Sequence, residues 1–230
     1  MNKDEFRTAI KGNFSNFSQT FFDKIEIYKN ELQEFNKHTN LTKLDKEEII
    51  YEQYFYDSII PYKNIDFKNN TKLLDIGSGS GIPGVVLKIL FEETIDLVII
   101  ESNGKKVKFL NLLANKLNIK IKILNKRAEE ITNNERDSFD IVTSRAVAEL
   151  KVLIEISVPY LKLNGLLIEP KSLDYDNEYK KATEIIKNIG IELVKIDEFN
   201  TNNKQHNVFC FKKIKPTSAK YPRQWNVIKK

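Results

Sequence analysis

Apolar residues near the start of the chain recur at steps of three and four between Phe14 and Phe35. This spacing predicts an amphipathic helix over 14–35, because residues three and four apart share one face of a helix. A second helical period covers 46–60, and a polar cluster at 66–71 follows it. We therefore predict a helical cap over residues 1–65, whose aromatic stripe packs against the main domain.

From Thr71 onward, short apolar runs alternate with longer helical periods. The short runs are typical of buried strands, and the periodic segments between them of helices. Strands joined in this way form a parallel sheet with helices on both faces. The predicted strands are 72–76, 95–101, 119–124, 139–143 and 165–169, and the predicted helices are 83–91, 105–117 and 148–161.

The end of the chain follows a different pattern. Two consecutive strand-like segments, 191–199 and 207–213, have only a loop between them. We expect them to pair as an antiparallel hairpin at one edge of the sheet. The predicted fold is therefore α/β and Rossmann-like, with a mostly parallel seven-stranded sheet and an antiparallel C-terminal hairpin. This main domain would cover 66–213, followed by a basic tail at 214–230.

The turn after the first predicted strand carries the most informative pattern. Asp75 precedes the alternating glycines Gly77, Gly79 and Gly81, and the next strand ends in Glu101. Glycines let the backbone turn tightly beside a ligand, and an acid at the next strand end suits ribose hydroxyls. Nicotinamide sites share these features, but the hairpin ending favours S-adenosylmethionine. A purely structural glycine turn is the alternative.

Two further polar segments follow predicted strands. One spans Lys126 to Glu130, and the other, Thr143 to Ala148, contains Arg145. Open α/β sheets bind ligands at the carboxyl ends of their strands. A guanidinium at such a place can hold a carboxylate or phosphate with two parallel hydrogen bonds. An internal ion pair is the other explanation for Arg145.

Composition narrows the function class. Of 230 residues, 41% are hydrophobic and 30% are charged, which is typical of a globular protein. The charged start and the lack of a long apolar run favour a soluble, cytoplasmic protein. A lone Cys210 offers no disulfide or cysteine-rich metal site, and no metal centre is expected. His38 and His206 are interpreted as ordinary residues rather than proton shuttles.

Positive charge is concentrated at the C-terminal end. Residues 201–230 hold eight basic residues and no acid, whereas the first 200 residues are mildly acidic. Tyr221 and Trp225 lie among these cations, an arrangement that suits bases and phosphates. Binding to a polyanion and a merely solvated tail are both compatible with this pattern.

An ordered series of motifs resembles one family along nearly the whole chain, the bacterial small-subunit ribosomal RNA guanine-N7 methyltransferase G, or glucose-inhibited division protein B. The series is strong because its members occur in the same order. Its members are Asn36-Lys37-x-x-Asn40-Leu41-Thr42, Asp57-Ser58, Asp75 to Gly84, Glu101 to Lys106 with Phe109-Leu110, Arg127-Ala128-Glu129, Ser144 to Ala148 and Tyr221-Pro222-Arg223.

This resemblance implies a class I methyltransferase that transfers a methyl group from S-adenosylmethionine to N7 of a guanine in small-subunit rRNA. The partner would be that rRNA or an assembling small subunit, and we expect a monomer. Ala128 and Glu129 would flank the adenine, Glu101 would meet the ribose, and Arg145 would be the catalytic residue. The expected cofactor-binding residues are Gly77, Gly79, Gly81, Ile82, Glu101, Ala128, Glu129 and Arg145.

The chain departs from the family pattern at three places. Gln53-Tyr54 stands where the family commonly has Arg-His, and Phe35 replaces a common Trp. Lys171-Ser172, preceded by Pro170, replaces a Lys-Gly pair. Three other functions compete with this interpretation: a nicotinamide oxidoreductase, a non-enzymatic RNA-binding or assembly factor, and a methyltransferase for small molecules or proteins.

Overall fold

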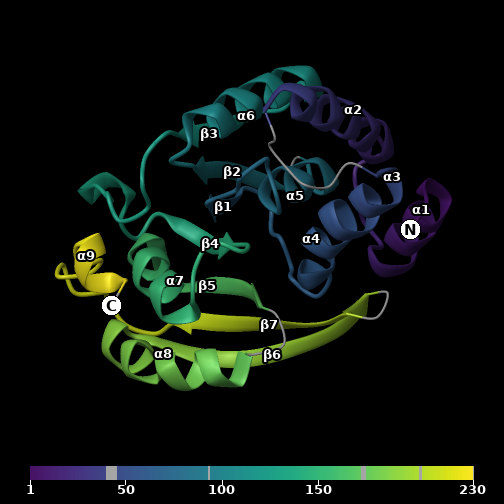
Figure 1. The fold of residues 1–230 in the computed structure, drawn as a ribbon. Helices are drawn as coiled ribbons and strands as arrows, with labels where there is room; N and C mark the ends of the chain where they lie inside the picture. Colours follow the sequence, from purple (N-terminus) through teal and green to yellow (C-terminus); the bar gives the residue numbers. More distant parts are fainter. Residues whose placement is uncertain (40–45, 93, 172–174, 202–203, 230) are drawn as a thin grey trace. The chain divides into compact units, whose positions relative to one another are not determined.

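The computed structural model of the chain describes residues 1–39, 46–92, 94–171, 175–201 and 204–229 (Figure 1). The chain forms two compact units. The first unit comprises Met1–Thr71 and Ser78–Asn125, and the second comprises Lys72–Gly77 and Lys126–Lys230. The chain therefore crosses between the units three times.

Among the described residues, the strands form a seven-stranded sheet in the order β3-β2-β1-β4-β5-β7-β6. Parallel pairing joins β2 to β3, β1 to β4 and β4 to β5, while β7 pairs antiparallel with β5 and β6. This arrangement confirms the predicted fold class. The strands are β1 (Thr71–Ile76), β2 (Ile95–Ile100), β3 (Ile121–Leu124), β4 (Phe139–Ser144), β5 (Leu161–Lys171), β6 (Ile191–Thr201) and β7 (Lys204–Lys213).

In the first unit, helices pack around the β2–β3 pair. The aromatic stripe contacts the residues that follow it in the chain: Tyr28 Oη donates to Ser80 O at 2.6 Å, and the Phe35 and Phe109 rings are 5.1 Å apart. The N-terminal helices thus support the loop after β1. The helical elements are α1 (Lys3–Asn13), α2 (Phe21–Thr39), α3 (Glu47–Ile49), the π-helix η1 (Ile50–Tyr56), α4 (Asp57–Ile59), the 3-10 helix η2 (Ile60–Tyr62), α5 (Gly84–Leu90) and α6 (Gly104–Leu117).

The predicted helix over 14–35 is wrong at both ends. Phe14 ends α1 with extended backbone and packs its ring against Phe91 at 6.0 Å, so α2 starts only at Phe21. At the other end, the helix continues past Phe35 to Thr39, whose hydroxyl donates to Phe35 O. Phe14 kept the helical spacing because it belongs to the same apolar core, although it lies outside the helix.

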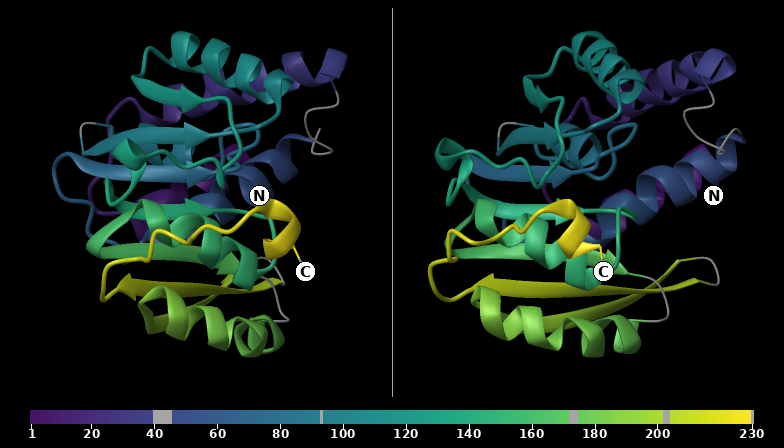
Figure 2. Two further views of the ribbon diagram at one scale, coloured as in Figure 1. Left: turned by 90° about the vertical axis from the view of Figure 1, so that its left-hand side faces the viewer. Right: turned by 60° about the vertical axis from the view of Figure 1, so that its left-hand side comes forward.

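In the second unit, α7 and α8 contact each other, and they also contact β4, β5 and β6. Figure 2 shows α8 in green beside the long hairpin of β6 and β7. The predicted helix over 148–161 is shorter in the structure, because Leu161 already belongs to β5. Helix α8 was not predicted, although Ala182, Ile185 and Ile189 recur at helical spacing. The helical elements are η3 (Asn133–Glu135), α7 (Leu150–Ser157), η4 (Val158–Tyr160), α8 (Tyr175–Ile189) and α9 (Trp225–Ile228).

The C-terminal segment, residues 214–229, is packed on the second unit. Tyr221 and Ile228 are buried at 5% and 4% exposure. Arg223 donates from Nε and Nη2 to the two oxygens of buried Glu155 on α7, at 2.8 and 2.5 Å. A freely solvated tail is therefore not what the described residues form. The predicted domain boundaries at 65 and 213 stay predictions.

Candidate functional site

In the first unit, the glycine loop is held by the N-terminal helices. Tyr28 Oη donates to Ser80 O, and Tyr54 Oη bonds the Ser80 hydroxyl. Gly81 has φ +111°, and a Cβ there would lie 2.4 Å from Tyr28 Oη. The glycine is therefore required for packing as well as for backbone conformation. Tyr54, at one of the departures from the family pattern, supports this loop.

Glu101 lies directly after β2 and is 5% exposed. Its Oε2 accepts a hydrogen bond from Gly79 N at 2.9 Å, and its Oε1 accepts one from Asn103 N at 2.8 Å. Each carboxylate oxygen has two lone pairs, so both retain one for a further donor. The structure thus brings the predicted residues Gly79 and Glu101 together, with an acceptor set that suits a ribose diol.

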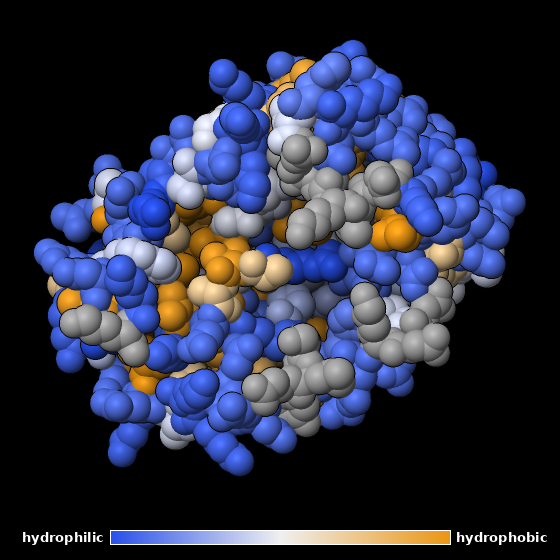
Figure 3. Space-filling view, in the orientation of Figure 1, coloured by the Kyte–Doolittle hydropathy of each residue, from blue (hydrophilic) through white to orange (hydrophobic). Residues whose placement is uncertain are grey.

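In the second unit, Gly77 follows β1 and packs against the segment after β4. A side chain at Gly77 would place its Cβ 2.6 Å from Val147 Cγ2, and its φ of +68° also favours glycine. Arg145 comes directly after β4 and is half-buried. Val147 is 41% exposed, and Figure 3 shows apolar side chains (orange) over the end of β4 and over α7. Gly77 and the segment that contains Arg145 therefore lie at one edge of this unit.

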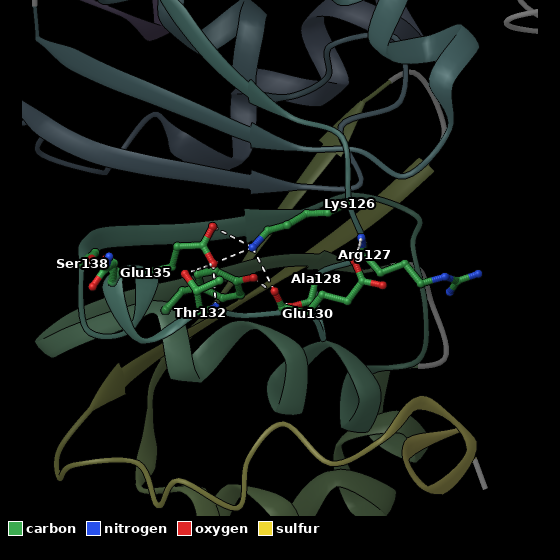
Figure 4. Close-up of polar contacts among 9 residues, drawn as sticks. Lys126, Arg127, Ala128, Glu130, Thr132, Glu135 and Ser138 are labelled. Atoms are coloured by element: carbon green, nitrogen blue, oxygen red, sulfur yellow. Dashed lines mark hydrogen bonds and ion pairs between the residues drawn. The ribbon is translucent and has the colours of Figure 1, made fainter.

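The loop after β3 carries Ala128 and Glu129 and is tied together by Lys126 (Figure 4). Lys126 Nζ lies 2.6 and 2.5 Å from the two carboxylate oxygens of Glu135, and it donates to Glu130 O at 3.0 Å. Burial alone would raise the pKa of Glu135, but hydrogen bonds from Lys126 and Thr132 outweigh it and hold the pKa below its ordinary value. Lys126, at the start of the loop, therefore contacts residues further along the same loop and fixes its conformation.

Ala128 is fixed from a second side. Tyr160 Oη donates to Ala128 O at 2.8 Å, and Ala128 is 6% exposed. Burial, assisted by nearby carboxylates, raises the pKa of Tyr160, so its hydroxyl remains a donor at physiological pH. Glu129 is half-buried, and its Oε1 lies 3.6 Å from Arg127 Nη1. Both predicted adenine-flanking residues thus have defined positions.

A buried acid at a strand end was not predicted. Glu169 on β5 is fully buried; its Oε2 accepts from Ser144 Oγ at 2.7 Å, and its Oε1 has no hydrogen-bond partner among the described residues. Burial is the main cause that raises the pKa of Glu169 to about 8; Asp75 and Glu178 also raise it, while Ser144 and Lys171 oppose the shift. The signal was an acid within the apolar run Leu166 to Pro170.

The predicted site residues thus fall into one group in each unit. The first unit holds Gly79, Gly81, Ile82 and Glu101, and the second holds Gly77, Ala128, Glu129 and Arg145. Their assignment to cofactor binding and catalysis stays a prediction. Part of one family motif, Asn40 to Thr42, and the departure at Ser172 lie outside the described residues.

Neither a metal-binding cluster nor a membrane-spanning helix is found over the described ranges. In that part of the chain, no group of three or more His, Cys, Asp or Glu side chains is placed to hold a metal ion. Within the same ranges, no helix combines the length and apolar character needed to cross a membrane.

Comparison with known proteins agrees with the fold and the motif series. Ribosomal RNA small subunit methyltransferase G of Ureaplasma parvum serovar 3 (strain ATCC 27815) is 42% identical over 234 residues, covering 100% of this chain and 99% of the relative. The protein of the same name from Malacoplasma penetrans is 47% identical over 208 residues, covering 89% and 87%.

A solved structure supports the fold alone. The crystal structure of a SAM-dependent methyltransferase from Aquifex aeolicus aligns with a TM-score of 0.58 at 17% identity, over 75% of this chain and 96% of that one. Residues 22–208 match the family described as rRNA small subunit methyltransferase G. With the fold, the glycine loop and the acid after β2, these matches show that the chain belongs to the rRNA small subunit methyltransferase G family, whose members are S-adenosylmethionine-dependent methyltransferases.

Proposed function

We propose that this protein transfers the methyl group of S-adenosylmethionine to N7 of a guanine in small-subunit rRNA. The observation that carries the proposal is membership in a family whose relatives are named for small-subunit rRNA methylation, with an acceptor set suited to the cofactor. The acceptor would be this rRNA, free or in an assembling subunit in the cytoplasm.

The residues of each unit fit the cofactor chemically. Glu101 is an acceptor-only, buried group with free lone pairs, which suits the two ribose hydroxyls. Gly79, which is half-buried, leaves the loop backbone partly accessible, while Ala128 and Glu129 would flank the adenine with an apolar surface and a hydrogen-bond acceptor. When bound, S-adenosylmethionine supplies an electrophilic methyl group on its sulfonium sulfur.

N7 of guanine carries a lone pair and no proton, so the protein need not supply a general base. Neither histidine is placed as one. His206 bonds Thr201 at 2.8 Å and stacks on Phe199, and the His38 side chain is 77% exposed at the end of α2. Catalysis would then consist mainly of holding N7 in line with the methyl group, an effect that can lower a barrier by roughly 7–11 kcal/mol.

Arg145 is proposed as the catalytic residue that orients the guanine. Replacing it with alanine should reduce kcat much more than RNA affinity, because its bonds would form at the reacting base. Arg7 on α1, whose guanidinium lies over the Phe22 ring, is the control: its alanine variant should keep both kcat and RNA affinity. Equal losses of kcat and RNA affinity in Arg145→Ala would contradict this role.

The test is methyl transfer from labelled S-adenosylmethionine to small-subunit RNA and particles from a strain that lacks this gene. The proposal expects a single N7-methylguanine after digestion and mass spectrometry. A label on another atom would exclude the guanine-N7 step. Cofactor binding without transfer would favour an assembly factor, and binding of a nicotinamide dinucleotide instead would favour an oxidoreductase.

A further inference from the structure

Lys126 and Arg127 are neighbours in the chain but point in opposite directions (Figure 4). Lys126 ties the loop after β3 together, whereas the Arg127 side chain is 55% exposed. Its guanidinium carbon lies 5.6 Å from the centre of the Trp225 ring, within the range of a cation–π contact. A residue of the predicted adenine loop thus lies over the indole of the C-terminal segment.

The indole is held in place by contacts on both sides of it in the chain. Arg223 N and side chain bond buried Glu155, while Ile228 is buried at 4% exposure. The Arg127 guanidinium is itself held by Glu129 at 3.6 Å. A surface prepared in this way loses little conformational freedom when a ligand binds.

Burial distinguishes the two aromatic residues that the sequence placed among the terminal cations. Tyr221 is 5% exposed and fills a core position, so it offers no face to a ligand. Trp225 is half-buried, with Lys220 and Lys229 exposed nearby in the chain. A flat ring beside cations is the combination that binds unpaired bases together with their phosphates.

We propose that Trp225, backed by Arg127, is a stacking surface for one unpaired base of the RNA substrate, separate from the guanine that is methylated. This inference rests on the proposed function for the identity of the RNA. It identifies the aromatic contact within the C-terminal segment and places it beside the loop of Ala128 and Glu129.

Trp225 is the only tryptophan in the chain, so its fluorescence reports this surface alone. The full-length protein would be titrated with single-stranded small-subunit rRNA fragments and, as a polyanion without bases, with heparin. RNA should quench the emission in a saturable manner at 0.3 M salt. At this concentration the electrostatic screening length is shorter than the roughly 10 Å that it has at about 0.1 M, so purely ionic binding is weakened. Equal quenching by heparin would overturn the proposal.

Variants separate stacking from folding. Trp225→Ala should raise the KM for RNA about 10-fold with kcat within twofold, since stacking of one base on an aromatic ring commonly strengthens binding by about this factor. Trp225→Phe should retain most of the affinity, because an aromatic face remains. Val227→Ala, which removes an exposed apolar side chain from the same helix, is the matched control and should leave the KM unchanged.

The outcomes also distinguish this inference from the proposed function. If Trp225→Ala keeps its thermal stability and the wild-type KM for RNA, the stacking surface is excluded even when N7 methylation is confirmed. If protein-free RNA fails to quench while small-subunit ribosomal proteins do, the surface binds protein and the proposal is wrong. Quenching by RNA without any methyl transfer would support the surface and contradict the proposed activity.

Discussion

The glycines of the loop after β1 show how one residue type satisfies two demands. A side chain at Gly81 would meet Tyr28 Oη, and one at Gly77 would meet Val147 Cγ2. Both also have positive φ, a region that favours glycine. The sequence pattern alone suggested close approach to a ligand, but the protein itself fills the space beside these two residues. The ligand contact is better tested at Glu101.

Replacing Glu101 with glutamine should weaken S-adenosylmethionine binding about 10- to 100-fold, because hydrogen bonds to charged groups contribute roughly 1.5–3 kcal/mol. The amide nitrogen would also face the donor N–H of Gly79 or Asn103. Calorimetry would measure the affinity. Asp96→Asn is the control, since Asp96 is an exposed acid on the same strand and should have no effect. Unchanged affinity in Glu101→Gln would show that Glu101 does not bind the ribose of S-adenosylmethionine.

Glu169 should make stability fall as pH rises. Its pKa is raised to about 8 in the folded state, against about 4.3 in an unfolded chain. The folded state therefore binds more protons between these values, so the stabilisation is complete below pH 4 and is lost as pH approaches 8.

Glu169→Gln replaces the acid with a neutral amide of similar shape and should abolish this dependence. Between pH 5 and pH 8, the wild type should lose on the order of 3 kcal/mol of unfolding free energy more than the variant. Urea unfolding at several pH values would measure the difference. Parallel pH profiles for the two proteins would show that Glu169 is not protonated in the folded state.

At the scale of elements, residues at a strand end can form a binding site only if the loop after the strand is fixed by contacts of its own. The loop after β3 has the Lys126–Glu135 ion pair, a capping box in which Thr132 and Glu135 bond each other, and the Tyr160 bond to Ala128 O. These contacts position the loop without using the side chain of Glu129. The loop is therefore held by contacts that leave the side chains of Ala128 and Glu129 unused.

Lys126→Met should disturb that scaffold and keep the side-chain length. We expect the KM for S-adenosylmethionine to rise about 10-fold with kcat within twofold, because the loop would no longer be held in its binding position; this change corresponds to about 1.4 kcal/mol of affinity. Lys126→Arg should restore most of the affinity, and Lys122→Met, at an exposed position of β3, should behave as the wild type. A fall in kcat with KM unchanged would contradict a positioning role.

The contact between α7 and the C-terminal segment depends on Arg223. Its alanine variant leaves the carboxylate of Glu155, 1% exposed, without its guanidinium partner. Because Arg223 itself is partly exposed, we expect the free energy of unfolding to fall by about 2 kcal/mol. This is less than the roughly 3–5 kcal/mol that is typical when one partner of a fully buried ion pair is removed. Thermal unfolding would measure it. Gln224→Ala is the neighbouring exposed control; equal stability of both variants would show that the pair contributes little.

At the scale of the whole molecule, the basic C-terminal end is less available than its charge suggests. Lys213 is buried, with its Nζ 2.6 Å from Asp137, and Arg223 is paired with Glu155. Burial lowers the pKa of Lys213, although Asp137 opposes the shift. We therefore expect residues 212–230 to contact RNA phosphates through their exposed lysines rather than through every cation.

Converting Lys215, Lys220 and Lys229 to glutamine should raise the KM for RNA and make its salt dependence shallower. Each lost phosphate contact reduces the slope of log affinity against log salt by about 0.7 to 0.9. The matched triple change, at the exposed residues Lys63, Lys68 and Lys120, should leave the slope unchanged. Equal slopes for the wild type and the C-terminal variant would show that this segment only solvates the protein.

Much of the fold could be predicted because its signals are local. Each β-α step has an apolar run followed by a helical period, so β1, α5 and α6 were predicted to within two residues. The break between α1 and α2 could not be predicted, because Phe14 keeps the helical spacing while packing against Phe91. Helix α8 was not predicted, although its apolar residues Ala182, Ile185 and Ile189 have a helical period.

Sequence by itself determined the fold class, the family motifs and the acid after β2, because hydrophobic period and glycine spacing act through neighbouring residues. Tertiary structure alone decided which charged side chains and aromatic rings remain at the surface, where a ligand could contact them. Lys213, Tyr221 and Glu169 are buried by segments distant in the chain, whereas Trp225 is only half-buried and lies beside Arg127. Burial depends on contacts between distant segments, so no local pattern of residues encodes it.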